Sequence, residues 1–502
     1  MNTPIADFLK EYSKSGFARF HMPGHKGRLG MSHDITEICG ADDLYHASGI
    51  IAESEANATL LFGTRRTFYS TEGSSLCIRT MLFLALKASN KDNSSEEYKN
   101  HETKNSRPFI LAGRNAHKTL LLTAALLDFD IEWLFSEAEE NSLCDCTITE
   151  KGLKNKLNEL ALQGRKPFAV FITSPNYLGK IADIESLAKI SHEANIPLLV
   201  DNAHGAYLKF LDNRKHPMEL GADLCCDSAH KTLPALTGTA YLHVGKEALF
   251  PYEEHVKYAM SLFGSTSPSY LLLESLDCCN KILAEDFGPL LKKCVHNVEE
   301  IKAFLNAKGI KTEETETEGI ETKGIKTEET EPLKIVINTS KMKMDGETFA
   351  NALRAYKIEP EFADKDYVVL MVSPYNSSED FEKLRSFAEE FSTRSYSSSA
   401  NSDDKISITE ALKEATATFE DNSSLTNKAS LTKLPPKLLT PHEAVFADNE
   451  EIQVSDALGR ICALPVVSCP PAIPIVAIGE EITEECIELL KIYGHDKIVV
   501  VK

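Results

Sequence analysis

The sequence has few of the features that mark membrane, secreted or nucleic-acid-binding proteins. It has no apolar run of the roughly 18 residues that a helix needs to cross a bilayer. Its first residues, MNTPIADFLKEYSKSGF, lack the basic start and the apolar core of a signal peptide. Its net charge of -21 disfavours nucleic acid and anionic membranes as partners, because both are polyanions. We therefore expect a cytoplasmic protein whose partner is a small molecule, not nucleic acid or a membrane.

The sequence also lacks an evident metal-binding pattern. Its twelve cysteines form no pair of C-x-x-C motifs, so we expect no zinc site and assign most of them to the core of a protein in a reducing compartment. His21 and His25 in HMPGHK form a candidate pair, but the intervening Pro-Gly disfavours a helical arrangement and no third ligand is evident. We expect this stretch to be a structural part of an N-terminal arm, and we expect no bound metal.

What is present indicates a globular protein of several domains with a mostly parallel sheet. The chain has 502 residues, 42% of them hydrophobic and 26% charged. Between residues 107 and 245, continuous apolar runs of strand length alternate with helical patterns, which predicts strands at 108–113, 130–135, 167–175 and from 196, and helices at 117–129 and 183–195. In such sheets ligands bind at the carboxyl ends of the strands, where Asp201 directly follows IPLLV.

Later parts of the chain read as a second, smaller α/β unit and a tail. Residues 332–391 show a strand-helix-strand-helix pattern, and GIKTEETE occurs at both 309–316 and 324–331 in a charged segment that we expect to be a solvated, disordered insertion. We predict these domains: an N-terminal arm, 1–60; a large domain, 61–285; a small α/β domain, 286–392, with the insertion 309–331; a linker, 393–432, with a possible helix at 408–419; and a C-terminal domain, 433–502.

Three polar stretches follow predicted strands and suit a phosphate-bearing, ring-containing cofactor. TEGSSLCIRTMLFLALKA, residues 71–88, opens a helix whose free N–H groups, with the hydroxyls of Ser74 and Ser75, would bind a phosphate. The carboxylate of Asp201 would keep a pyridine nitrogen protonated, and the imidazole of His117 would stack on the ring. For each of these residues, a helix cap, a turn or a purely structural role is the alternative.

The fourth stretch is CCDSAHKTLPALTGTAYLH, residues 225–243, where Lys231 stands at the edge of a buried strand. A surface turn with a solvated lysine is one explanation, and a lysine held as a Schiff base to a carbonyl cofactor is the other. The second explanation requires a partly desolvated pocket, with Ser228 and His230 near the phosphate. Together the four stretches indicate pyridoxal 5'-phosphate (PLP) as the cofactor.

Several motifs resemble the Orn/Lys/Arg decarboxylase family over nearly the whole chain. They are FHMPGHKG (20–27), RNAHKT (114–119), VDNAHGAY (200–207), SAHKTLPALTGTAYLH (228–243), STSPSYLLLESLD (265–277), LTPHEAVFADNEEI (439–452), GRI (459–461) and PPAIP (470–474). The resemblance implies an α/β protein with a PLP fold type I (aspartate aminotransferase-like) large domain, a smaller α/β domain and a C-terminal α+β domain. It also implies a homodimer with a shared active site, similar to short forms without the N-terminal wing domain, many of which are arginine decarboxylases.

The resemblance assigns residue roles and an activity. It implies that Lys231 carries the cofactor, Asp201 pairs with the pyridinium and His117 stacks on the ring. Cofactor contacts are further implied for Ser74, Ser75, Ser228 and His230, with Ala203 and His204 on the other side of the ring, and His230, Lys231 and His117 are the candidate proton donors. The implied reaction is PLP-dependent decarboxylation of a basic amino acid in polyamine biosynthesis, with arginine favoured, giving agmatine, and with lysine and ornithine open. Because a cationic substrate needs an acidic partner, Glu361 and Asp364 are candidates on position, with solvated loop carboxylates as the alternative.

The sequence departs from the family at the phosphate turn, where Glu72 replaces the usual asparagine. Its carboxylate would repel a phosphate unless it points away or pairs, for example with Arg65 or Arg66. Two alternative functions stay open: another PLP enzyme of the same fold, an aminotransferase or lyase that would use Arg354 or Arg385 for the substrate carboxylate, and a non-catalytic paralogue that acts as a binding protein.

Overall fold

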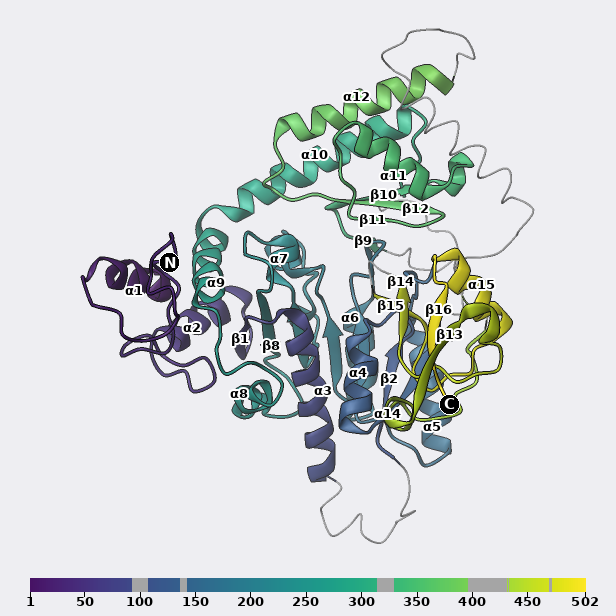
Figure 1. Cartoon of the computed structure of the whole chain (residues 1–502), viewed down its shortest axis with the longest axis horizontal. Helices are drawn as coiled ribbons and strands as arrows, with labels where there is room; N and C mark the ends of the chain where they lie inside the picture. The colour runs from purple at the N-terminus through teal and green to yellow at the C-terminus, as the bar shows by residue number, and fades with distance from the viewer. Residues whose placement is uncertain (93–106, 136–141, 314–328, 396–430, 432, 469–471) are drawn as a thin grey trace. The chain divides into compact units, whose positions relative to one another are not determined.

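The computed structural model describes residues 1–92, 107–135, 142–313, 329–395, 431, 433–468 and 472–502 (Figure 1). It divides into two compact units. The first unit comprises Met1–Phe135, Ile148–Ser174 and Ala182–Gly288, and the second comprises Ser136–Thr147, Pro175–Ile181 and Pro289–Lys502. Most of the predicted insertion 309–331 and of the predicted linker 393–432, including the possible helix at 408–419, lies outside the described residues. Among the described helices, none combines the length and the apolar composition that crossing a bilayer requires.

The first unit contains a seven-stranded sheet in which only one strand runs against the others. From edge to edge the order is β1 (Arg66–Ser70), β8 (Ala240–Val244), β7 (Leu224–Asp227), β6 (Leu198–Asp201), β4 (Val170–Thr173), β2 (Phe109–Gly113) and β3 (Asp130–Leu134). Strands β7, β6, β4, β2 and β3 pair in parallel, whereas β8 is antiparallel to both of its neighbours. These pairings confirm the predicted mostly parallel sheet. The prediction holds because strands that are apolar throughout are buried on both faces, as in parallel sheets.

Helices of the first unit pack against this sheet and against each other. They are α1 (Pro4–Lys14), α2 (Ile50–Phe62), α3 (Gly73–Asp92), α4 (Thr119–Leu127), α5 (Glu150–Leu162), α6 (Ile184–Glu193), α7 (Ala229–Thr232), α8 (Val256–Ser261) and α9 (Tyr270–Glu285). Helix α6 begins where its sequence predicts, since the side chain of Asp183 accepts a hydrogen bond from the Ser186 N–H. Helix α3 contacts β1, β7 and β8 and runs alongside α4 (Figure 1), which brings its first turn to the carboxyl edge of the sheet.

The second unit contains the predicted strand-helix-strand-helix pattern. A three-stranded antiparallel sheet, β10 (Lys334–Asn338), β12 (Tyr367–Met371) and β11 (Phe362–Ala363), occurs with α10 (Phe287–Ala307), α11 (Gly346–Ala355) and α12 (Ser378–Ser395). Three two-stranded pairs complete the unit with α14 (Pro441–Phe446) and α15 (Glu484–Ile492): β13 (Asn449–Gln453) with β16 (Lys497–Val501), β14 (Val466–Ser468) with β15 (Ile473–Val476), and β5 (Lys180–Ile181) with β9 (Glu329–Thr330).

The second unit combines segments that the sequence assigns to different domains. The predicted small domain, 286–392, and C-terminal domain, 433–502, share one hydrophobic core, in which Val369 and Phe362 pack in the same cluster as Ile475 and Leu489. Two short stretches that the sequence places in the large domain, 136–147 and 175–181, also belong to this unit. The reason is burial: apolar side chains from all these segments cover one another, and a polar linker in the sequence does not reveal that the domains on either side of it are packed together.

Candidate active site

A candidate anion-binding turn, the phosphate cradle, lies between the end of β1 and the start of α3. Gly73, the first residue of α3, has a φ of +66°, a region that favours glycine, and its N–H donates to the carbonyl of Gly238 at 2.7 Å. No described atom lies within 4 Å of the position that a Cβ of Gly73 would take. The first N–H groups of a helix have no partner within the helix, and together with the helix dipole they favour a phosphate at the start of α3.

Hydroxyl groups from three elements meet at this turn. The Oγ of Ser228 donates to the Oγ of Ser74 at 3.0 Å, and the Oγ1 of Thr119 donates to the Oγ of Ser75 at 3.4 Å. The structure therefore brings the three serines predicted for the phosphate together at the helix start. The sequence analysis missed Thr119, although it stands in the quoted RNAHKT motif.

Lys231 lies on the short helix α7, next to an imidazole of the neighbouring strand end. Its Nζ is 2.9 Å from the Nε2 of His204, which is itself buried. In the isolated chain Lys231 is exposed, which differs from the partly desolvated pocket that the sequence predicts for it. The adjacent His230 donates its Nδ1–H to the carbonyl of Thr239 at 2.9 Å, since a carbonyl oxygen only accepts. His230 is therefore held in one orientation by the backbone that leads into β8.

The predicted ring-nitrogen partner, Asp201, is a buried carboxylate at the end of β6. Its Oδ1 accepts the N–H of Ala203 at 3.1 Å and the thiol of Cys226 at 3.5 Å, and only 4% of the residue is exposed. Cys226 lies directly across from Asp201 in the β6–β7 pairing. One donor from the turn after β6 and one from β7 therefore fix this buried carboxylate.

The pKa of His117 depends on the charges of both Asp201 and Lys231. Burial lowers the pKa of His117; the charge of Asp201 acts against this shift and that of Lys231 reinforces it. The N–H of Thr119 donates to Nδ1 of His117 at 3.2 Å, so the neutral ring carries its proton on Nε2. The charges of the predicted ring-nitrogen partner and of the predicted cofactor lysine thus both act on the pKa of His117.

Glu72 has a partner other than those predicted for it. Its Oε1 accepts the N–H of Ser265 at 2.5 Å, in the segment STSPSY. Arg65 instead pairs with Glu253 at 3.4 Å, and the guanidinium of Arg66 lies over the ring of Phe68. The expectation of an Arg65 or Arg66 pair was wrong because a backbone N–H, which no sequence pattern marks, takes this carboxylate.

The remaining candidates have local partners within their own units. In the first unit, Nε2 of His21 lies 2.7 Å from the hydroxyl of Tyr12 and Nε2 of His25 lies 3.0 Å from Asp34, so the two histidines have different partners. In the second unit, Nε of Arg354 donates to Glu359 at 2.8 Å.

The two acidic candidates of the second unit differ sharply in exposure. Glu361 is exposed and its carboxylate accepts the hydroxyl of Tyr177 at 2.7 Å. Asp364 is buried, and its Oδ1 accepts the N–H groups of Asp366 and Tyr367 at 2.9 and 2.7 Å. Asp364 therefore caps the turn between β11 and β12, and the alternative of a solvated loop carboxylate is wrong for it.

The first-unit residues suit PLP as a set. A phosphate needs the open helix start and the hydroxyls, a basic ring nitrogen needs the buried carboxylate of Asp201, and an aldehyde needs the amine of Lys231. The carboxylate of Glu72, the one member of this turn with a charge unfavourable to a phosphate, is bonded to the backbone N–H of Ser265.

Comparison with known proteins gives the same family that the motifs resemble. Residues 3–380 match the Orn/Lys/Arg decarboxylase major domain, and residues 424–495 match the C-terminal domain of that family. Arginine decarboxylases of Bacillus anthracis and Bacillus subtilis (strain 168) are each 28% identical over 507 residues, covering 97% of this chain and 92% and 93% of those proteins.

A solved structure shows the fold. The constitutive lysine decarboxylase of E. coli superimposes with a TM-score of 0.79 at 17% identity, covering 100% of this chain and 82% of that one. The α/β architecture is thus that of PLP fold type I enzymes, as the resemblance implies. With both family domains matched in order along the sequence, the chain belongs to the Orn/Lys/Arg decarboxylase family and is an amino-acid decarboxylase, a carbon–carbon lyase.

Proposed function

We propose that the chain decarboxylates arginine to agmatine and that it uses PLP as its cofactor. The observation that supports this most directly is the group of hydroxyls at the start of α3, where Ser228 bonds to Ser74 and Thr119 bonds to Ser75, with Lys231 three residues after Ser228. The relatives named arginine decarboxylase, which match nearly the whole chain, favour arginine over lysine and ornithine. Agmatine formation would place the enzyme in polyamine biosynthesis, in the cytoplasm.

In this proposal the residues of the first unit hold the cofactor at three points. The N–H groups of α3 and the hydroxyls of Ser74, Ser75 and Ser228 bind its phosphate. Asp201 keeps its ring nitrogen protonated, because the charged form of each group favours that of the other. His117 packs on one side of the ring, and Ala203 and His204 line the other.

When bound, PLP supplies an aldehyde for the substrate amine and a cationic ring that accepts the electrons released with CO2. Lys231 would hold the aldehyde of the cofactor through Nζ, and His204, whose Nε2 lies 2.9 Å from that nitrogen, would orient the amine. Protonation of the α-carbon has three candidate donors: Lys231 at Nζ, His117 at Nε2 and His230. Since His230 is already committed at Nδ1 to the Thr239 carbonyl, only its Nε2 is available for this step.

For the cationic end of the substrate, the two acidic candidates of the second unit stay a prediction from their position in the sequence, and Glu361 is favoured. Its carboxylate is exposed, and the hydroxyl of Tyr177 orients it. A carboxylate can accept two parallel hydrogen bonds from a guanidinium, which suits arginine better than an ammonium substrate. Asp364 is a weaker candidate, since it is buried, two backbone N–H groups bond to its Oδ1 and the hydroxyl of Ser142 bonds to its Oδ2.

Self-association is also part of the proposal. Several large apolar side chains on the N-terminal arm are exposed in the single chain, among them Phe17, Phe20, Met22 and Leu29. Apolar surface of this kind is stabilised by covering it, and a second copy of the chain is the partner that the family resemblance implies. Sedimentation of the purified protein should give a dimer.

Product identification tests the proposed activity. The purified chain, loaded with PLP, is incubated separately with arginine, lysine and ornithine, and amines, CO2 and keto acids are quantified. We expect agmatine and CO2 from arginine in equal amounts, and no product from Lys231→Ala with an unchanged circular dichroism spectrum. A keto acid in place of CO2 would identify an aminotransferase. A chain that PLP cannot load would support a binding protein without activity.

A further inference from the structure

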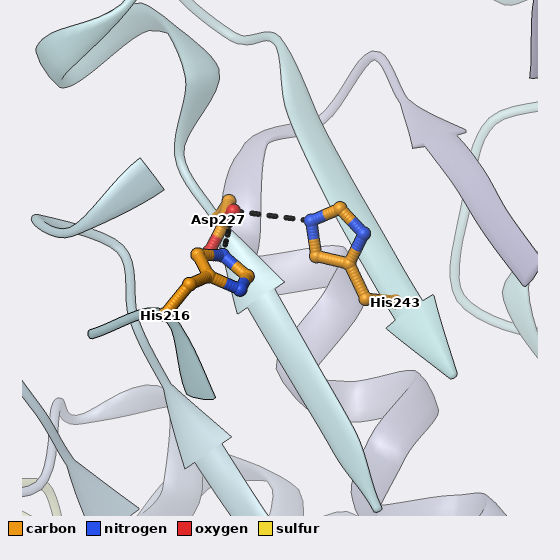
Figure 2. A group of neighbouring side chains, drawn as sticks. All are labelled: His216, Asp227 and His243. Carbon is orange, nitrogen blue, oxygen red and sulfur yellow. Dashed lines mark hydrogen bonds and ion pairs between the residues drawn. The ribbon is translucent and has the colours of Figure 1, made fainter. Parts of the chain in front are cut away.

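Three fully buried polar side chains form a cluster beside the proposed site. His216, Asp227 and His243 are each 0% exposed, and both imidazole Nε2 atoms meet the same oxygen, Oδ2 of Asp227, at 2.9 and 3.0 Å (Figure 2). Asp227 ends β7 directly before Ser228, and His243 lies on the neighbouring strand β8. The sequence analysis gives none of these three residues a role, although Asp227 and His243 stand in the quoted stretch 225–243, and the proposed reaction does not use them.

Two histidines and a carboxylate are also a donor set that zinc accepts, so the proton positions decide what the cluster is. The N–H of Met218 donates to Nδ1 of His216 at 3.3 Å. Nδ1 of His216 is therefore an acceptor, and its single proton is on Nε2, which donates it to Asp227. This nitrogen has no lone pair left for a metal.

The second histidine is arranged in the same way. Nδ1 of His243 lies 2.8 Å from Oγ1 of Thr67, which is in turn 2.8 Å from Oγ1 of Thr64. This chain of hydroxyls lets Thr67 donate to Nδ1, so that Nε2 of His243 carries its proton toward Asp227. Burial lowers the pKa of His243, which favours this neutral ring. Although burial opposes it, the two imidazoles lower the pKa of Asp227, and the cluster carries one negative charge.

The other oxygen of Asp227 connects the cluster to the proposed cofactor site. Oδ1 accepts the side-chain amide of Asn202 at 2.6 Å and the thiol of Cys225 at 3.7 Å. Asn202 follows Asp201, and its own N–H donates to the carbonyl of Cys226 at 3.0 Å. Since successive side chains of a strand point to opposite faces, the cluster lies on the face of the sheet opposite the carboxylate of Asp201.

We propose that Asp227 is a positioning residue. Without a metal, its hydrogen bonds hold the ends of β6 and β7 together on the face of the sheet opposite the carboxylate of Asp201. Four donors converge on it, and a carboxylate is the side chain with enough acceptor sites for all four. Fixing Asn202 fixes the backbone that carries Asp201, and fixing the end of β7 fixes Ser228. The link to the cofactor rests on the proposed function.

Asp227→Asn tests this role, because asparagine has the shape of aspartate but carries an NH2 group in place of one carboxylate oxygen. That NH2 group would face the N–H or S–H donors that bond to Asp227. We expect the dissociation constant of PLP, measured by absorbance titration of the full chain, to rise about tenfold. Hydrogen exchange of a peptide that spans β6 and Asn202 should become faster in the chain without PLP, since the Asn202 N–H lies in the loosened link. The exchange measurement does not depend on PLP, so it separates failure of the network from failure of the proposed function.

Asp223→Asn is the matched control. Asp223 is equally buried, precedes the same strand β7, and its Oδ2 meets Nε2 of His192 at 2.8 Å, but it lies at the opposite end of the strand from Ser228. We expect it to lower the melting temperature without changing PLP affinity or exchange at Asn202. Equal effects of the two variants on PLP affinity would overturn the proposal.

Two further outcomes bear on the cluster. If Asp227→Asn does not fold, Asn202→Ala cuts only the link and should give the same faster exchange at the end of β6; unchanged exchange would contradict the proposal. One equivalent of zinc that stays with the wild-type chain through dialysis and is lost in Asp227→Asn would overturn it in favour of a metal site, whereas a metal-free wild-type chain agrees with it.

Discussion

Asp201 of the first unit and Asp364 of the second are buried almost equally, at 4% and 5% exposure, and both accept the N–H of the residue two positions later. They differ in what surrounds them. Asp201 and Lys231 both act electrostatically on His117, and all three are proposed to act on the cofactor. Asp364 instead has the hydroxyl of Ser142 and backbone N–H groups as partners. Burial and turn geometry therefore do not distinguish a reactive carboxylate from a structural one, but its charged neighbours do.

The largest effect expected from this comparison is on the pH dependence of stability. Burial raises the pKa of Asp364 to about 7, so its contribution to stability is fully present below its ordinary pKa and is lost as the pH rises through 7. The loss between pH 4 and pH 8 should be at most about 4 kcal/mol. Asp364→Asn should remove this part of the pH dependence in calorimetric unfolding. Parallel curves for the two proteins would show that Asp364 is not the titrating group.

The reciprocal test is on catalysis. Asp201→Asn should lower kcat by about 10²–10³-fold, because the charge that stabilises the cationic ring is lost where water is excluded. Asp364→Asn should leave kcat with arginine within about twofold of wild type, because Asp364 only caps the turn between β11 and β12. Similar losses in both variants would break the distinction between the two carboxylates.

A smaller effect is expected at the phosphate cradle. Ser74→Ala removes a hydroxyl that would donate to a charged oxygen, and the dissociation constant of PLP should rise about tenfold. Ser89→Ala, at the far end of the same helix, removes a hydroxyl bonded to the carbonyl of Leu86 and should leave that constant unchanged. The measurement is an absorbance titration with both variants in parallel, and equal constants for Ser74→Ala and wild type would remove Ser74 from the cradle.

The smallest effect concerns Glu72. Glu72→Gln keeps an acceptor for the Ser265 N–H but removes a negative charge from the phosphate turn. PLP affinity should rise about twofold at low ionic strength and the gain should vanish at high salt, since an exposed charge is screened. An affinity that does not change at low salt would mean that the carboxylate is too distant to act on the phosphate.

Much of the first unit was predictable because local sequence determines it. Strands that are apolar throughout predict a parallel sheet, and a parallel sheet places its site at the carboxyl ends of its strands, where Ser74, Asp201 and Lys231 stand. The family motifs add roles to these positions. The exposure of Lys231 in the single chain was not predictable, because it depends on what surrounds the end of a short helix.

What the sequence could not reveal are contacts between distant segments. His216, Asp227 and His243 carry no motif spacing, and only the pairing of β7 with β8 brings two of them together. The same holds for residues 175–181, which join the second unit through the pairing of β5 with β9 and through the ion pair of Lys180 with Asp145 at 2.6 Å. Such contacts between distant residues depend on the topology of the fold, which cannot be read from a single sequence.

Strand β7 is four residues long, and an aspartate held by histidine stands at each end of it, Asp223 before the first residue and Asp227 at the last. A strand anchored at both ends cannot slip in register, and a slip of one residue would exchange the faces of Cys225 and Cys226. Helix α7 begins two residues after this strand ends, so the bonds of three imidazoles to the two aspartates also fix where the backbone that carries Lys231 begins.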